Sequence, residues 1–465
     1  MKQYKLIILT SLLITLLGSC AKDLDDSPIS NNDINDFIYR GLNRNYLYVN
    51  NVPALVENKQ NTANYQAFLN SNTPENFFES LLFDRQNTDR FSWITSDYLA
   101  LEQQFQGISM VNGMEFGLKR ITLNNDTVFG YVKYVLPNTS AALNNITRGM
   151  LFTSINNETL TVSNFRRLID NDFYSIQLAN YNSTTNEITP NGTSVTLTKQ
   201  VYTENPVFLS STFTVDTETV GYLVYNSFTP EFNSQLNAVF ANFNASGIDQ
   251  LVLDLRYNPG GSVNTATLLA SMITGQFNGQ IASKLNYNFN LSSNNRTYNF
   301  TNSFNGQTVN SLNLPKVYVL TTSNTASASE MIINSLKPYI DVVQIGTNST
   351  GKSQASITLY DSPNFRRANV NPSHLYAMQP LVAITANVND EVVPGTGIVP
   401  QTVLAEDIFN LGILGDQTEP LLAEAIAQID ALNRPTNTST TILKPAVNVI
   451  HSSSVKPFSN SMYLD

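Results

Sequence analysis

The stretch Lys316–Lys352, which reads KVYVLTTSNTASASEMIINSLKPYIDVVQIGTNSTGK, decides the fold of this chain. Lys316–Leu320 is rich in β-branched and aromatic residues and predicts a buried strand. A run of small residues follows, and then a short apolar helix that Pro338 ends. Asp341–Ile345 predicts a second strand, which leads into a loop bounded by glycines. The alternation of strands and helices here and in the neighbouring sequence predicts a mainly parallel sheet.

The loop after the second strand has two interpretations. Gly346-x-x-x-x-Gly351-Lys352-Ser353 matches the pattern of a phosphate-binding loop. That pattern requires a helix to follow, so that backbone N–H groups and the helix dipole hold the phosphate. Residues 354–360 instead alternate and are rich in β formers, which predicts a strand. We therefore expect no nucleotide partner.

The second interpretation pairs Lys352 with Ser327. A serine hydroxyl is a weak nucleophile until a base takes its proton. A lysine amine serves as that base only when burial or a neighbouring cation lowers its pKa. The chain holds two histidines, His374 and His451, and neither lies in a turn of small residues. A Ser–Lys dyad is therefore easier to build here than a Ser–His–Asp triad.

Two motifs in this stretch resemble those of the C-terminal processing peptidases, also called tail-specific proteases. Thr325–Glu330, T-A-S-A-S-E, is similar to the family's nucleophile motif S-A-S-A-S-E. The resemblance implies that Ser327 is the nucleophile. Ser349–Ser353, S-T-G-K-S, is similar to the family's T-F-G-K-G loop, which implies that Lys352 is the general base. The separation of the two residues along the chain matches the family's usual spacing.

A third motif lies upstream, where an apolar strand at Gln250–Arg256 is followed by Y-N-P-G-G. It resembles the family's D-L-R-x-N-P-G-G. The resemblance implies that the backbone N–H of Gly260 or Gly261, together with that of Ala328, forms the oxyanion hole. Such a donor is typically worth about 10²–10³ in rate.

The lysine loop departs from the family in several places. Members often carry a glutamine four residues after the lysine, which orients it. That position is Ser356 here, and Gln354 lies close by, so both are possible lysine-orienting residues. Ser349-x-x-Lys352 also matches the S-x-x-K of penicillin-recognising enzymes. Their S-D-N and K-T-G elements do not occur in this sequence.

Residues 105–203 resemble the PDZ-like domain of these peptidases. Phe116-Gly117-Leu118 is predicted to be the carboxylate-binding turn before the strand that accepts a peptide. Residues 148–157 resemble the G-D-x-I-x-x-I-N-G hairpin of such domains. A PDZ groove takes a peptide by strand addition. The alternative is a small β domain that only covers the active site.

The N-terminal residues 1–20 predict a lipoprotein signal peptide. Lys2 and Lys5 precede the apolar run Leu6–Leu17, which is too short to span a bilayer comfortably. Leu17-Gly-Ser-Cys20 resembles a bacterial lipobox, so Cys20 is the predicted site of lipidation. It is the single cysteine of the chain, and no disulfide framework is possible. We expect an outer-membrane lipoprotein of the cell envelope, on its periplasmic or surface face, although an ordinary signal peptide is an alternative.

The remaining sequence divides into four segments. Residues 21–104 predict a tether and a small helical domain, 105–203 the PDZ-like β domain, and 204–435 a catalytic core with a mainly parallel sheet and flanking helices. Residues 436–465 are rich in Thr, Ser and Asn and predict a loosely held tail. The fold class is therefore multidomain α/β (α+β).

These features predict a serine endopeptidase that hydrolyses peptide bonds in envelope proteins or peptides. Its expected partners are a peptide or unfolded protein substrate and, through the lipid, a membrane. The formal net charge of −10 argues against a nucleic-acid partner. The chemistry requires no metal and no organic cofactor. The alternative is a catalytically inactive lipoprotein that binds peptides or glycans on a peptidase scaffold.

Overall fold

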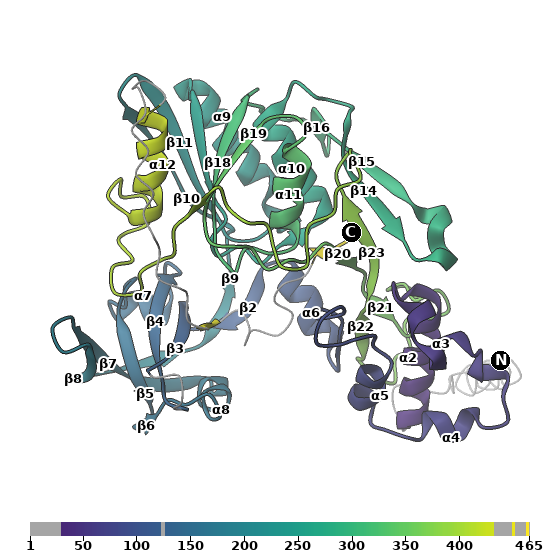
Figure 1. Ribbon diagram of the computed structural model, residues 1–465. Coiled ribbons are helices and arrows are strands. Elements are labelled where there is room, and N and C mark those ends of the chain that lie inside the picture. The colour runs from purple at the N-terminus through teal and green to yellow at the C-terminus, as the bar shows by residue number, and fades with distance from the viewer. Residues whose placement is uncertain (1–28, 122–125, 432–448, 452–461, 465) are drawn as a thin grey trace, which may run out of the picture. The chain divides into compact units, whose positions relative to one another are not determined.

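Figure 1 shows the computed structural model of the chain, which describes residues 29–121, 126–431, 449–451 and 462–464. The predicted signal peptide and Cys20 lie outside these residues. None of the helices they form is both long enough and apolar enough to cross a bilayer. The chain forms two compact units. Unit 1 ends at Leu99 and also contains Thr358–Pro380, and unit 2 contains Ala100–Ile357 and the residues from Leu381 onwards.

Unit 1 is mainly helical, as predicted for the N-terminal region. Helix α2 (Asn31–Asn45) is capped by Ser30, whose hydroxyl accepts the N–H of Asp33. Its apolar stripe, which includes Phe37 and Leu42, is buried. The other elements of unit 1 are η1 (Val49–Asn51), α3 (Pro53–Val56), η2 (Lys59–Asn61), α4 (Tyr65–Leu69), α5 (Pro74–Ser80) and a sheet of β1 (Trp93–Thr95), β22 (Ala377–Gln379) and β21 (Leu359–Tyr360). Helix α6 (Tyr98–Phe105) spans the boundary between the two units.

The first sheet of unit 2, which we call the core sheet, has the order β10-β11-β12-β18-β19-β24. Its strands are parallel except at the β10–β11 pair, so the predicted parallel sheet is confirmed. The strands are β10 (Val207–Val215), β11 (Glu218–Tyr225), β12 (Gln250–Asp254), β18 (Lys316–Thr321), β19 (Asp341–Gly346) and β24 (Thr402–Val403).

Helices cover both faces of the core sheet (Figure 1). Leu223 and Leu253 pack with residues of α9 (Asn233–Ser246), α10 (Val263–Thr274) and α11 (Ala328–Leu336). Tyr222 and Val252 point the other way and pack against α12 (Pro420–Ala431). Because successive side chains of a strand alternate between faces, the unbroken apolar runs of β11 and β12 fill two cores.

A second sheet has the order β13-β26-β20-β23-β14-β15. The Asn-rich segment before Leu314 contributes the β14–β15 hairpin to it. Its strands are β13 (Gly261–Ser262), β26 (Met462–Tyr463), β20 (Gln354–Ser356), β23 (Leu381–Ala386), β14 (Ile281–Tyr287) and β15 (Arg296–Asn299). The same Asn-rich region also forms η4 (Phe289–Asn294) and the small hairpin of β16 (Ser303–Phe304) and β17 (Gln307–Thr308).

A third sheet has the order β25-β3-β4-β5-β7-β8, with β6 paired to β5. Its strands are β25 (Val449–His451), β3 (Met114–Arg120), β4 (Val128–Val135), β5 (Leu151–Ile155), β6 (Glu158–Thr159), β7 (Phe173–Asn182) and β8 (Glu187–Thr198). Nearby lie α7 (Ser140–Leu143), α8 (Phe165–Asp170) and the pair of β2 (Ile108–Val111) and β9 (Gln200–Thr203). The residues of this region form a core of their own.

The turn predicted at Phe116-Gly117-Leu118 is wrong, because all three residues lie inside β3. The prediction took Gly117 as the sign of a turn. A Cβ at Gly117 would meet the ring of Tyr131 on the neighbouring strand, so this glycine makes room for a side chain instead of forming a turn.

The tail predicted to be loosely held is also ordered in two places. Residues 449–451 form β25, at the edge of the third sheet, and 462–463 form β26, inside the second sheet. The remainder of the tail lies outside the described residues. Local composition predicts a loose segment here because the strand partners are far away in the sequence.

Candidate active site

Ser327 lies at the turn between β18 and α11, in a strained conformation. Its φ of 68° and ψ of −117° fall outside the regions that residues with a side chain normally adopt. Such strain costs of order 1–3 kcal/mol and persists only where the surrounding structure imposes it. The side chain is fully buried, and its hydroxyl has no hydrogen-bond partner among the described residues.

Glu330 joins the turn of Ser327 to the lysine loop. Its Oε2 accepts the backbone N–H of Ser327 at 2.7 Å and that of Lys352 at 2.8 Å. Its Oε1 accepts the N–H of Gly351 at 2.6 Å and the hydroxyl of Ser349 at 2.5 Å. The backbone nitrogens of Ser327 and Lys352 therefore both bind one oxygen of a single buried carboxylate.

The sequence analysis missed this role of Glu330, although the residue is the last one of the T-A-S-A-S-E motif. A carboxylate three residues into a helix often accepts backbone N–H groups before the helix. That signal would have predicted the bond to Ser327, but not the bonds to a loop that follows the next strand.

The lysine loop is closely packed. Gly351 has a φ of 82°, and a Cβ there would collide with the backbone of Gly395 and Gly397. The N–H of Ile398 donates to the hydroxyl of Ser349 at 2.7 Å. Lys352 itself is 1% exposed. The chain continues into β20 and not into a helix, so the interpretation as a phosphate-binding loop is wrong.

The turn Asn258–Gly261 lies directly against Ser327. A Cβ on Gly260 would be 2.7 Å from the Cβ of Ser327. The carbonyl of Asn258 accepts the N–H of Ala326 at 3.1 Å and the hydroxyl of Ser329, also at 3.1 Å. The third motif and the nucleophile motif are therefore in contact.

The two glycines of this turn differ in where their N–H groups point. The N–H of Gly260 donates to Oδ1 of Asn258 at 2.9 Å, within the turn. Phe228 pairs with one edge of β13, through the carbonyl of Gly260 and the N–H of Ser262. Successive peptide groups of a strand point to opposite edges, so the N–H of Gly261 points away from Phe228. Ala328 is the first residue of α11, so no carbonyl inside that helix accepts its N–H.

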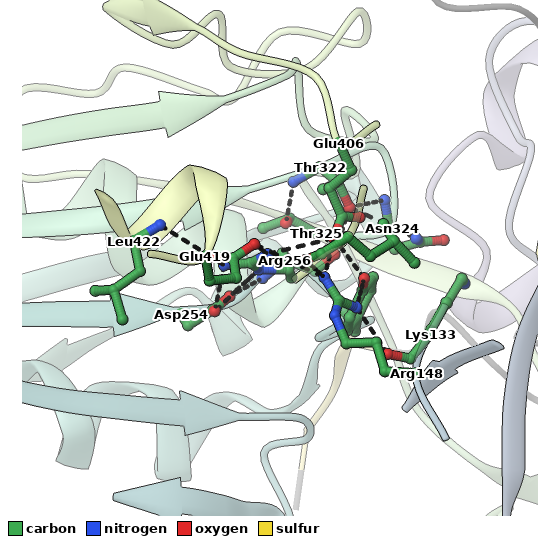
Figure 2. A network of polar contacts seen from close by, with 12 residues as sticks. Lys133, Arg148, Asp254, Arg256, Thr322, Asn324, Thr325, Glu406, Glu419 and Leu422 are labelled. Atoms are coloured by element: carbon green, nitrogen blue, oxygen red, sulfur yellow. Dashed lines mark hydrogen bonds and ion pairs between the residues drawn. The ribbon is translucent and has the colours of Figure 1, made fainter. Parts of the chain in front are cut away.

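Behind this turn lies a buried network of charges, which Figure 2 shows. Arg256 is fully buried between Asp254 and Glu419. Its Nε donates to Asp254 at 2.9 Å, and its Nη1 and Nη2 donate to the two oxygens of Glu419 at 2.6 and 2.9 Å. A buried arginine between two carboxylates holds the strand end before the turn in one position.

The network continues from the core sheet to the third sheet through Glu406 and Arg148, which lies between β4 and β5. Oε1 of Glu406 accepts Nη2 of Arg148 at 2.8 Å, Nη1 of Arg256 at 3.3 Å and the hydroxyl of Tyr257 at 2.5 Å. Burial alone would raise the pKa of Glu406, but the charges of Arg148 and Arg256 outweigh it and lower the pKa to about 2. Arg148 also binds Tyr257 directly, at 2.6 Å.

The structure places the other predicted residues as follows. The hydroxyl of Ser356 donates to the carbonyl of Met462 at 3.0 Å. Gln354 of β20 pairs with Ile384 of β23. His374 contacts Asp361 in unit 1 at 3.1 Å, and His451 lies in β25. Among the described residues, no group of three or more His, Cys, Asp and Glu side chains could hold a metal ion.

Two family models match the chain. Residues 219–367 match the model of peptidase family S41, and residues 33–93 match that of the peptidase S41 N-terminal domain. A probable CtpA-like serine protease of Staphylococcus epidermidis is 26% identical over 140 residues, which are 30% of this chain. The match spans only 26% of the length of that relative.

Solved structures share the fold over most of the chain. A putative S41 protease from Bacteroides fragilis has a TM-score of 0.68 and 24% identity, and the match covers 87% of this chain and 98% of that one. The photosystem II D1 C-terminal processing protease has a TM-score of 0.52 and 16% identity, and the match covers 87% of this chain and 99% of that one. The mixed α/β fold with a helical N-terminal region is thus that of S41 proteases, and the sequence relatives are CtpA-like.

Proposed function

We propose that this chain, which carries domains of peptidase family S41, is a serine endopeptidase with Ser327 as nucleophile and Lys352 as general base. The observation that carries the proposal is the pair of bonds from Glu330 to the backbone N–H groups of both residues. Through these two hydrogen bonds, one carboxylate fixes the backbone of a strained serine and that of a buried lysine, which lie in separate loops. A purely structural turn has no need of a strained serine whose hydroxyl lacks a partner.

The proposed reaction uses only groups of this chain. Oγ of Ser327 attacks a peptide carbonyl while Lys352 takes the hydroxyl proton. The N–H groups of Gly261 and Ala328 stabilise the oxyanion. Lys352 then gives its proton to the leaving amine, and an acyl-enzyme remains. Water, activated by the neutral amine, attacks the ester and releases the new carboxylate with the serine restored.

Supporting roles belong to the same proposal. Gln354 and Ser356 follow the lysine on β20, where they would orient it. The third sheet would present a peptide to the site through β3, which contains Phe116–Leu118 and is second in the sheet's strand order, after β25. Lipidation of Cys20 would hold the enzyme at the outer membrane, where envelope proteins and peptides are its substrates.

The direct test measures cleavage of an unfolded protein with an apolar C-terminus by residues 21–465. Ser327→Ala and Lys352→Ala should each lower the rate on the order of 10³-fold or more, because both residues take part in the same step. Ser303→Ala and Lys316→Ala, on β16 and β18, are matched controls outside the site and should keep full activity. Activity retained by both site variants would contradict the proposal, and peptide binding without turnover by any form would favour a binding protein.

A further inference from the structure

The segment Met462–Leu464 lies inside the second sheet as its strand β26, between β13 and β20. Met462 and Tyr463 pair in parallel with Gly261 and Ser262. On the other side, Tyr463 pairs with Ser356, whose carbonyl accepts the N–H of Leu464 at 3.1 Å. The hydroxyl of Ser356 donates to the carbonyl of Met462 at 3.0 Å. A segment near the C-terminus of the sequence is thus bound on both edges.

The two strands that hold this segment are the ones that flank the proposed chemistry. β13 contains Gly261, and β20 begins two residues after Lys352. The edge of β13 opposite Phe228 pairs with β26, and the N–H of Gly261 points to that edge. The backbone of β26 therefore lies where the proposed oxyanion donor points.

Side chains also hold the segment in place. Met462 is fully buried. Tyr463 stacks on Phe105 with ring centroids 4.3 Å apart. The buried cluster around the methionine consists of Val263, Leu285, Met331, Ala355, Val382 and Ala383. The cluster thus accommodates the unbranched apolar side chain of Met462, and the ring of Phe105 stacks on the next residue, Tyr463.

The same tail also occupies the edge of the third sheet. β25 pairs in antiparallel fashion with β3, and Ile450 lies opposite Leu118 while His451 lies opposite Gly117. β3 is the strand that we expect to accept a peptide by strand addition. Both edges to which a substrate would add are therefore paired with residues of the chain's own tail.

We propose that Val449–His451 and Met462–Leu464 are intramolecular occupants of the two peptide-accepting edges, and that Met462–Leu464 competes with substrate for the space between β13 and β20. This inference rests on the proposed function for its effect on cleavage, but the occupancy itself does not. The tail acts as a pseudo-substrate that a peptide of similar chemistry must displace.

The test compares residues 21–465 with a form that stops at Asn460 and with Leu464→Pro. The proline removes the N–H that donates to Ser356 and keeps the chain length. Leu464→Ala is the matched control, because it shortens the side chain and keeps that N–H. The truncated form and Leu464→Pro should cleave the substrate about tenfold faster than the parent, and Leu464→Ala should change the rate less.

Binding of the synthetic peptide NSMYLD, which is residues 460–465, gives a second readout that needs no turnover. In the Ser327→Ala background, the labelled peptide should bind the truncated form, as fluorescence anisotropy reports, and should not bind the full chain. Thermal unfolding checks that each variant is folded. If the truncated form does not fold, Leu464→Pro takes its place in both measurements. Equal rates in folded variants together with no peptide binding would overturn the inference. Selective peptide binding without turnover by any form would uphold the occupancy and contradict the proposed peptidase instead.

Discussion

At the scale of single residues, the close approach of Gly260 to Ser327 constrains the candidate site. Gly260 has a φ of 115°, which favours glycine, and its Cα faces the Cβ of Ser327. Two effects would follow from a side chain here. One is backbone strain, and the other is a clash that moves the nucleophile.

Gly260→Ala separates these effects when it is compared with Gly279→Ala. Gly279 also has a positive φ, of 83°, but a Cβ there meets nothing within 4 Å. Both variants should lose about 1 kcal/mol of stability from strain. Only Gly260→Ala should lose activity, by about 10²-fold in kcat, because an attacking atom displaced by about 1 Å is poorly aligned. Equal kcat values for the two variants, measured beside their urea midpoints, would show that the contact has no part in catalysis.

At the scale of elements, Glu330 couples α11 to the loop between β19 and β20. Its two oxygens accept four hydrogen bonds, from Ser327, Ser349, Gly351 and Lys352. A carboxylate has the acceptor capacity for all four, whereas an amide replaces one acceptor by a donor. The choice of Glu at this position is therefore set by two segments that are separated in the sequence by a whole strand.

Glu330→Gln should consequently loosen the loop and the turn together. We expect a loss of about 2–3 kcal/mol in the free energy of unfolding, because N–H donors face an NH₂ group in the interior. The value of kcat/KM should fall by about 10²-fold through misplacement of the lysine. Urea unfolding and steady-state kinetics measure the two effects, with exposed Glu187→Gln on β8 as the control. A variant with the parent's activity and stability would contradict the coupling role of Glu330.

At the scale of the whole of unit 2, the buried charge network joins the third sheet to the core sheet. Arg148 reaches from the third sheet to Tyr257, which lies three residues before Gly260. Glu406 accepts hydrogen bonds from Arg148, Arg256 and Tyr257. Because its folded pKa is near 2 and its ordinary value is 4.5, the ionised carboxylate stabilises the fold above about pH 4.5.

This stabilisation should be lost as the pH falls from about 4.5 towards about 2. The lowered pKa corresponds to about 3 kcal/mol, since one pKa unit is worth about 1.4 kcal/mol. Urea unfolding over this pH range should show Glu406→Gln less stable than the parent at pH 7, with the difference shrinking in acid. If the two stability curves run parallel from pH 7 to pH 2, the carboxylate does not hold the network together.

The sequence by itself determined the elements and most of the candidate residues. The strands at Lys316–Leu320 and Asp341–Ile345, and the small-residue turn between them, follow from local composition, and the structure contains them as β18, β19 and the start of α11. The motifs around Ser327 and Gly260 were recognised by their resemblance to those of the C-terminal processing peptidases. Each is a short run whose residue types are constrained by its own turn.

Only the tertiary structure decided which groups meet. It distinguished the N–H of Gly261 from that of Gly260, it placed Phe116–Leu118 inside a strand, and it ordered Met462 and Tyr463 as β26. Each of these outcomes depends on a hydrogen-bond or packing partner that is distant in the chain. Periodicity and composition report a segment's own preferences, whereas the partner of a backbone N–H is chosen by the sheet into which the segment folds.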